Sequence, residues 1–285
     1  MHSLVELSKP RITQLVVLTA AAGYYLGERG GFRLWVFAAT LIGTALVAAG
    51  TNAFNMVRER EIDARMRRTR NRPLPSGRVS PRAAIVFASV TAAAGIGFLA
   101  WQVNLLTAAL AGLTLVSYVW FYTSLKPRTS LNTLVGAVPG ALPVLGGWTA
   151  AGGGLSPAAW GMFWILFLWQ LPHFLALAWI YREDYRTAGL AMLSIDDPDG
   201  SRTARMALLY AVALVPVSLL PAVYGVTGRA YFVGALVFSL TYVVAAALML
   251  FRPGRRQALA WRVFIVSILY LPALLTLAVL DKVRV

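Results

Sequence analysis

The chain has 285 residues, of which 59% are hydrophobic and 13% charged, and its mean hydropathy is positive. A soluble domain carries about 25% charged residues, so this composition excludes an ordinary soluble protein and indicates a polytopic protein of the lipid bilayer. The formal charge of +15 reflects basic residues in short loops between apolar runs, which is typical of membrane topology and not of nucleic-acid binding, and the absence of cysteine excludes disulfides and thiolate metal sites.

Nine apolar runs are each long enough to cross a bilayer. We expect them near residues 11–27, 34–57, 82–101, 104–122, 131–150, 157–181, 203–225, 229–251 and 260–280. No good signal-peptide cleavage site follows the first run, so we interpret it as a span. Residues 102–104 leave open whether the third and fourth runs form one bent helix. The sequence predicts an all-α fold of nine transmembrane helices in a single domain, residues 1–285.

The charges on the loops predict the orientation of these spans. One side holds the N-terminus and the 2–3, 4–5, 6–7 and 8–9 loops, and it contains 21 of the 26 Lys and Arg residues. By the positive-inside rule, the N-terminus is therefore cytoplasmic. Eight of the 11 Asp and Glu residues lie in two loops on this same side, after the second and sixth runs. We expect an active site there that takes a charged head group from the cytoplasm while an apolar tail lies in lipid.

Three oxygen-bearing side chains follow the second run at a spacing of four residues: Asn55, Glu59 and Asp63. On a helix this spacing stacks them along one face. One interpretation is a helix end that pairs with its own arginines, such as Glu61 with Arg65. The alternative is a magnesium site, because Mg2+ takes oxygen ligands and binds through one or two carboxylates plus substrate phosphate. A polar residue at the edge of a span, such as Asn55, favours the functional interpretation.

A cluster of arginines comes next and suits the binding of phosphate. Arginine makes bidentate contacts to phosphate oxygens, and the two prolines at positions 73 and 75 stiffen this segment. Topology anchors are the alternative for part of the cluster. We predict Arg70 and Arg72 to contact a diphosphate; the whole cluster is Arg67, Arg68, Arg70, Arg72 and Arg78.

Two further loops on the same side carry candidate residues. The 4–5 loop contains Lys126, which is one of three lysines in the chain, and Arg128 two residues later. In the 6–7 loop, Arg182 is followed by Glu183 and Asp184, which lie close enough to the membrane to join the metal site. Each loop alone would be interpreted as a short charged connection. The run Asp196–Asp199 is interpreted as solvated.

One histidine, His173, lies inside the sixth run beside Pro172. An isolated histidine within a membrane is usually a hydrogen-bonding partner between helices. Pro172 interrupts the hydrogen bonding of the helix, however, and Gln170 is near. The alternative is therefore that His173 belongs to a binding site for a polar or metal-bearing substrate.

Several blocks of the sequence, spread from about residue 5 to residue 205, form a combination that is specific where any one alone would be weak. The blocks are Asn55-x3-Glu59-x3-Asp63, Arg68-Thr-Arg-Asn-Arg-Pro-Leu-Pro-x-Gly-Arg78, Tyr122-Thr-x2-Leu-Lys126-x-Arg128-Thr-x2-Asn132-Thr, Gly136-Ala-x-Pro-Gly-Ala-x-Pro143, Pro172-His173-Phe and Arg182-Glu-Asp-Tyr185-x3-Gly189-x2-Met192-Leu. Together they resemble the UbiA superfamily of intramembrane prenyltransferases, and within it the branch that farnesylates haem.

The resemblance implies a helical bundle around a central cavity in the bacterial plasma (inner) membrane. It implies transfer of a farnesyl group from farnesyl diphosphate to a vinyl group of haem B, with Mg2+ as the metal, to give haem O and diphosphate. By the same resemblance, Asn55, Glu59, Asp63, Glu183 and Asp184 would hold the metal. Diphosphate would be bound by Arg70, Arg72, Lys126, Arg128 and Arg182. His173 would contact the haem, and a haem-handling membrane protein would be a partner.

Two departures from the superfamily pattern matter. Position 59 is Glu where the superfamily has Asp, which adds one methylene to the reach of the carboxylate. The superfamily's second motif, two aspartates four residues apart, is replaced by Glu183 and Asp184, which puts a second metal site in doubt. The alternatives that remain are a superfamily member that prenylates another aromatic acceptor and, from a different class, a small-molecule transporter with polar residues along its path.

Overall fold

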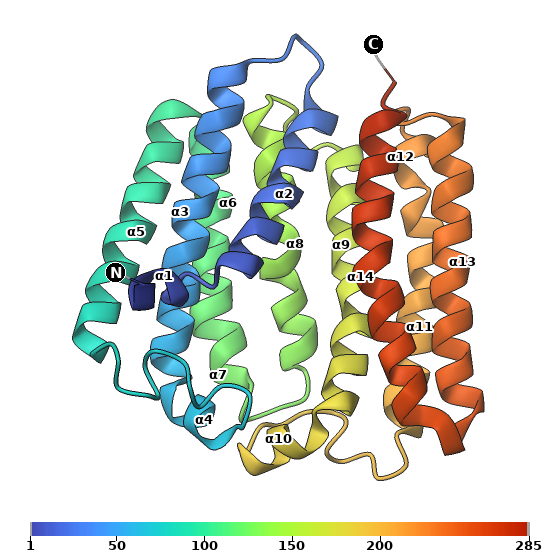
Figure 1. The fold of residues 1–285 in the computed structure, drawn as a ribbon. Helices are drawn as coiled ribbons and strands as arrows, with labels where there is room; N and C mark the ends of the chain where they lie inside the picture. The colour runs from blue at the N-terminus through green and yellow to red at the C-terminus, as the bar shows by residue number, and fades with distance from the viewer. Residues whose placement is uncertain (1, 284–285) are drawn as a thin grey trace.

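The computed structural model describes residues 2–283, in which one isolated bridge between Thr227 and Lys282 is the sole β-type pairing beside the helices. Long helices stand side by side, while short helices lie across or between their ends (Figure 1). The elements are α1 (His2–Leu7), α2 (Pro10–Gly27), α3 (Leu34–Arg58), α4 (Arg60–Arg65), α5 (Pro81–Gln102), α6 (Leu105–Val116), the π-helix η1 (Ser117–Tyr122), α7 (Thr123–Leu125), α8 (Asn132–Ala150), α9 (Pro157–Ile180), α10 (Arg182–Thr187), α11 (Ser201–Ser218), α12 (Leu220–Val223), α13 (Arg229–Phe251), the 3-10 helix η2 (Pro253–Arg255) and α14 (Arg256–Leu280).

Eight helical stretches within residues 2–283 are long and apolar enough to cross a membrane, judged by length and composition. They correspond to the second to ninth predicted spans. The first predicted span coincides with α2, an 18-residue helix that is not among the eight. Its first turns carry the polar residues Arg11, Thr13 and Gln14, which lower its apolar content. The all-α fold is therefore confirmed, whereas the count of nine spans stays a prediction.

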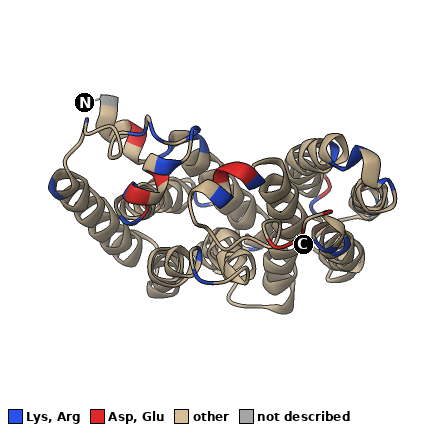
Figure 2. Ribbon diagram, turned by 90° about the horizontal axis from the view of Figure 1, so that it is seen from below, with Lys and Arg blue, Asp and Glu red and all other residues tan. Residues whose placement is uncertain are grey.

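Four connections meet at one end of the bundle, which we call the charged end: residues 58–81, 123–132, 181–201 and 251–256. Figure 2 views the bundle from this end and shows acidic and basic residues gathered on α4, α10 and the loops beside them. The last helix, α14, ends at the opposite end of the bundle (Figure 1). The two acid-bearing loops thus lie at the same end of the bundle, as the sequence predicts.

Local capping explains where several helices begin. The side chain of Asn104 accepts a hydrogen bond from the backbone N–H of Thr107, so it caps a new helix. This cap separates α5 from α6, and the third and fourth predicted spans are two helices. Ser80 and Ser156 cap α5 and α9 in the same way, each followed by a proline in the first turn.

Glycine allows two helices, α2 and α8, to approach closely. A Cβ built on Gly147 would lie 1.9 Å from the carbonyl oxygen of Ala20, and one on Gly23 would lie 2.1 Å from that of Val144. Small residues at such contacts are the usual basis of helix packing within membranes. In lipid there is little hydrophobic driving force for helices to associate, so close van der Waals packing matters more. This contact holds α2 against the bundle although its first turns are polar.

Replacing Gly147 with alanine should therefore destabilise the protein, because the new methyl group would overlap the backbone of α2. Overpacking of this kind costs about 1–3 kcal/mol, which should lower the midpoint of thermal unfolding in detergent. The matched control is Gly146→Ala on the same helix, where a Cβ meets nothing within 4 Å. That variant should be neutral or slightly stabilised, since alanine favours helix over glycine. Equal midpoints for the two variants would contradict the close contact.

Candidate active site

The stripe of Asn55, Glu59 and Asp63 runs from the last turn of α3 into α4. The helix is interrupted at Glu59, yet the backbone N–H of Glu59 bonds the carbonyl of Asn55 at 2.9 Å, and that of Asp63 bonds the carbonyl of Glu59 at 2.7 Å. The i, i+4 register therefore continues through the break. The three residues are 0%, 5% and 1% exposed, and they line one polar cavity of about 200 Å³ at the charged end.

Each of these three side chains bonds to a cation from another part of the chain. The Nζ of Lys9 donates to the Oδ1 of Asn55 at 2.6 Å, and Lys126 forms an ion pair with Glu59. The Nη1 of Arg72 lies 2.9 and 2.7 Å from the two oxygens of Asp63. At the charged end, these bonds therefore connect the stripe to the start of α2, to the segment after α7 and to the loop after α4.

The cavity carries an excess of positive charge. Four basic side chains line it, Lys9, Arg68, Arg72 and Lys126, against the carboxylates of Glu59 and Asp63. Such a surplus in a partly enclosed site favours an anion that carries more than one negative charge. The arrangement suits a phosphate-bearing ligand.

Burial and neighbouring charge act on the cavity residues in opposite directions. Burial disfavours the charged form of Glu59, but the positive charges of Lys126 and Lys9 outweigh it and lower the Glu59 pKa. Burial also opposes the charge on Lys126, yet Glu59 and the neighbouring tyrosines raise its pKa well above the ordinary value. For Lys9 burial dominates and lowers the pKa to about 8. The Glu59–Lys126 pair is therefore ionised at neutral pH.

Three of the arginines predicted to bind diphosphate do not line this cavity. Arg70 and Arg128 are exposed outside it. The guanidinium of Arg182 lies 4.4 Å from the ring centroid of Trp179 and donates to the carbonyl of Pro198. Of the predicted diphosphate ligands, the structure brings Arg72 and Lys126 to the cavity, and the other roles stay predictions.

The two acids of α10 lie apart from the stripe. The carboxylate of Glu183 is exposed and pairs with Arg186 at 2.6 Å, one turn away on the same helix. Asp184 is half-buried and is not part of the cavity lining. Within residues 2–283 there is no group of three or more His, Cys, Asp and Glu side chains that could hold a metal. The metal-binding roles predicted for Glu183 and Asp184 stay predictions.

The run Asp196–Asp199 is not simply solvated. Asp197 is 1% exposed, and its Oδ2 accepts from both the backbone N–H and the hydroxyl of Thr203 at 2.7 Å. These bonds satisfy donors at the start of α11. The expectation of a solvated run was therefore wrong for Asp197, which has a structural role.

The sequence reasoning missed Lys9 and Tyr185, which both line the cavity. Lys9 is the one residue other than glycine with positive φ (47°) in the described part of the chain, and it joins α1 to α2. Strained backbone of this kind concentrates at functional sites. A signal was present, because Lys9 and Lys126 are two of only three lysines in a chain that otherwise uses arginine.

A larger, mostly apolar cavity of about 400 Å³ continues from the polar one into the bundle. The two meet at the π-helix η1, whose Tyr118 and Tyr122 face both. Short π-helices frequently occur at functional sites. The residues common to both cavities are Ile12, Tyr118, Tyr122, Gly136, Phe174 and Leu177. A ligand with a charged head and an apolar tail could lie across this junction.

His173 faces the apolar cavity, just beyond the junction. Its ring is stacked between Trp169, at 5.5 Å, and Phe264, at 4.9 Å between centroids. Its Nδ1 lies 2.7 Å from the hydroxyl oxygen of Ser267 on α14. The structure thus places His173 in the cavity wall, as a contact to a substrate requires, and also bonds it to a neighbouring helix.

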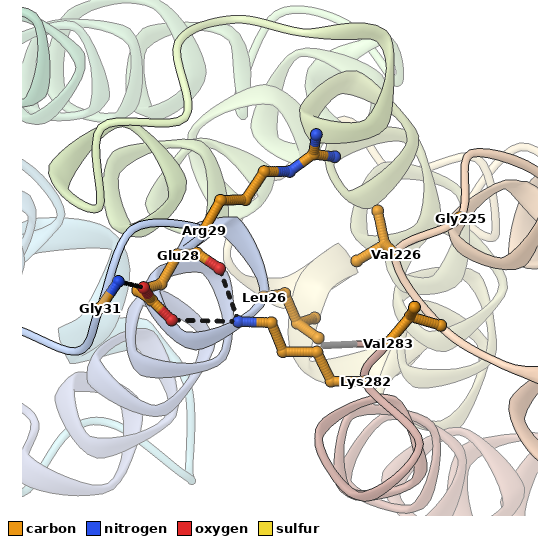
Figure 3. A pocket seen from close by; sticks show the side chains of 8 residues that line it. All are labelled: Leu26, Glu28, Arg29, Gly31, Gly225, Val226, Lys282 and Val283. Carbon is orange, nitrogen blue, oxygen red and sulfur yellow. Dashed lines mark hydrogen bonds and ion pairs between the residues drawn. The ribbon is translucent and has the colours of Figure 1, made fainter. Parts of the chain in front are cut away.

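A separate pocket of about 150 Å³ lies at the end of the bundle where α14 ends (Figure 3). Two of its charged groups satisfy each other: the Nζ of Lys282 donates to the carbonyls of Tyr25 and Glu28 at 2.7 Å and pairs with the Glu28 carboxylate. These bonds fasten the chain after α14 to the end of α2. We assign this pocket a structural role.

Comparison with known proteins agrees with this geometry. The profile of the UbiA prenyltransferase family matches residues 16–268. The chain belongs to the UbiA prenyltransferase family. Its relatives include proteins named protoheme IX farnesyltransferase from Solibacter usitatus, 44% identical with 99% of each chain covered, and from Salinibacter ruber, 45% identical with 96% of each covered.

Solved structures show that this UbiA-family chain has the family's fold. One is described as digeranylgeranylglyceryl phosphate synthase; its TM-score is 0.84 at 18% identity, covering 100% of this chain and 99% of that one. A UbiA homologue from Archaeoglobus fulgidus, bound to GPP and Mg2+, has a TM-score of 0.65 at 16% identity, covering 97% and 99%. At these identities the likeness establishes the fold alone.

Arg72→Ala should weaken the binding of inorganic pyrophosphate in the presence of Mg2+, because it removes a cation from the cavity and leaves Asp63 buried without its partner. A hydrogen bond to a charged group contributes about 1.5–3 kcal/mol, so titration calorimetry should show a loss of roughly tenfold or more. Arg70→Ala is the matched control, since Arg70 lies two residues away and outside the cavity. An equal loss in both variants would argue for a general effect of surface charge.

Proposed function

We propose that this protein transfers the farnesyl group of farnesyl diphosphate to a vinyl group of haem B, giving haem O and diphosphate. The observation that carries the proposal is the continuity of a cationic cavity at the charged end with an apolar cavity inside the bundle. A prenyl diphosphate has this same division, a multiply charged head and a hydrocarbon tail. The junction at Tyr118 and Tyr122 would then lie beside the bond between head and tail.

The choice of acceptor rests on the relatives and on His173. Relatives named protoheme IX farnesyltransferase are 38–45% identical to this chain, and several cover nearly all of it. Haem is apolar over its faces and carries an iron that imidazole can bind. His173 provides an imidazole in the wall of the apolar cavity.

The residues of the stripe fit Mg2+. Asn55, Glu59 and Asp63 provide an all-oxygen set of side chains in one cavity, and Mg2+ is usually bound by one or two carboxylates together with substrate phosphates. Related UbiA structures are described as bound to Mg2+ with GPP or DMAPP. We assign the metal to these three residues. When bound, it would neutralise charge on the departing diphosphate.

The reaction needs charge stabilisation more than acid–base chemistry. The bond between the farnesyl C1 and the diphosphate oxygen breaks, and its electron pair leaves with the diphosphate, where Lys9, Arg72 and Lys126 stabilise the growing negative charge. The π electrons of a haem vinyl group attack the allylic cation and form the new carbon–carbon bond. Water then adds to the resulting vinyl-derived cation and releases a proton, which leaves a hydroxyl group. The apolar cavity keeps other water away from the allylic cation.

The orientation follows from the loop charges. We place the chain in the bacterial plasma (inner) membrane with the N-terminus and the charged end in the cytoplasm. Farnesyl diphosphate would enter with its head in water and its tail in lipid. A membrane protein that delivers or receives haem would be a natural partner, since both substrate and product are poorly soluble.

Incubation of the purified protein with haem B, farnesyl diphosphate and Mg2+ should yield a product with the mass of haem plus one farnesyl group and one hydroxyl group. Chelation of Mg2+ should abolish its formation. Unchanged haem together with prenylation of an aromatic acid such as hydroxybenzoate would favour the alternative acceptor. Absence of prenyl transfer to either acceptor would favour the transporter alternative.

Asp63→Asn should lower turnover in this assay by at least about 100-fold, because it removes a metal-binding charge and the partner of Arg72. Losses of 10–100-fold are typical even for residues that only support metal ligands. Glu61→Gln is the matched control, as Glu61 is exposed on the same short helix and does not line the cavity. Full turnover in the Asp63 variant would remove this residue from the site.

A further inference from the structure

We propose that Ser267 is a positioning residue that holds His173 in the Nδ1–H tautomer, so that the lone pair of Nε2 is free to bind the iron of haem. The inference deepens the proposed function and rests on it for the identity of the ligand. It concerns two residues on different helices, His173 on α9 and Ser267 on α14.

The hydrogen-bond geometry around Ser267 carries the assignment of the protons. Its hydroxyl lies within hydrogen-bond distance of the backbone carbonyl of Phe264, one turn earlier on α14, and a serine hydroxyl has a single proton to donate. The Nδ1 of His173 lies 2.7 Å from the same oxygen. We assign the hydroxyl proton to the Phe264 carbonyl, so that the serine oxygen accepts from Nδ1, which then carries the proton of a neutral imidazole and leaves Nε2 unprotonated. The opposite assignment, in which the hydroxyl donates to Nδ1, would place the proton on Nε2.

The ring has little freedom to change this arrangement. It is stacked between Trp169 and Phe264, with interplanar angles of 28° and 29°. The indole N–H of Trp169 donates to the backbone carbonyl of Ser267 at 2.8 Å, which joins the same two helices a second time. Ser267 is fully buried. Water is thus kept from the Nδ1 contact, and the ring plane is fixed by packing.

The other nitrogen lies across the ring from this bond. Within the described part of the chain, Nε2 has no hydrogen-bond partner, while His173 itself lines the apolar cavity. The amide nitrogen of the nearby Gln170 is already committed, because it donates to the carbonyls of Ala137 and Leu166. An imidazole in a cavity wall that is hydrogen-bonded through one nitrogen and unpaired at the other has the arrangement of a metal-binding histidine.

The tautomer can be measured without any substrate. The chain has two histidines, His2 and His173, so ¹⁵N-histidine labelling of a His2→Gln variant leaves one imidazole in the NMR spectrum of the full-length protein in nanodiscs. We expect the shifts of an Nδ1–H imidazole. An Nε2–H imidazole would overturn the proposal, since that nitrogen could not bind iron.

Ser267→Ala should remove the tautomer preference in this spectrum and weaken haem binding by roughly 10–100-fold, the usual range for a residue that supports a metal ligand. Haem binding would be followed by titrating haem B and recording its absorption spectrum. His173→Ala should lose the imidazole-ligated spectrum altogether.

Ser239→Ala is the matched control, because Ser239 is a buried membrane serine that bonds Ser218 and Tyr270 outside the cavity. It should keep the tautomer and the haem affinity of the wild type. A Ser267→Ala protein that binds haem as tightly as this control would overturn the proposal. If Ser267→Ala does not fold, the wild-type NMR spectrum still decides the tautomer. Failure of the proposed function is recognised separately, as haem binding through His173 without any farnesylated product.

Discussion

The structure depends on the pairing of buried oxygens with buried cations at the charged end. Removing an ion from water costs several kcal/mol even after the protein relaxes, so Glu59 and Asp63 cannot be buried without opposite charges beside them. Lys126 and Arg72 provide these charges, and Lys9 bonds the neighbouring Asn55. Each comes from a different connection. One stripe on α3 and α4 thus determines how three separate segments fold over the mouth of the cavity.

The stripe was predictable from the sequence because it is local. Asn55, Glu59 and Asp63 share a face through the helical period alone, and their register survives the break at Glu59. For Lys9 the sequence offers only its rarity as one of three lysines, since its contact with Asn55, 46 residues away, arises only through the packing of α2 against α3. For Glu183 the sequence does not show that its exposed carboxylate pairs with Arg186 on the same helix, and its predicted metal role stays a prediction.

The interior of the bundle shows why so few of its polar residues are available to a ligand. Within a membrane a hydroxyl must find a partner, and several threonines of the cavity wall bond the carbonyl one turn earlier on their own helix, as Thr51 and Thr114 do. Sequence alone treats these residues and His173 alike, as polar residues in apolar runs. The structure separates them, because His173 lines the cavity and its hydrogen bond to Ser267 uses only one of its two ring nitrogens.

The same pairing constrains how ligands enter under the proposed function. A divalent cation alone would meet a cavity lined by four basic side chains and two carboxylates, with Asn55, Glu59 and Asp63 already bonded to Lys9, Lys126 and Arg72. A diphosphate alone would be attracted by the four basic side chains but repelled by the two carboxylates. Bound together, the oxygens of the stripe would hold the metal while the released cations would bind the phosphate, so every charge would keep a partner. Under the proposed function the cavity would therefore favour a metal–diphosphate pair over either component alone.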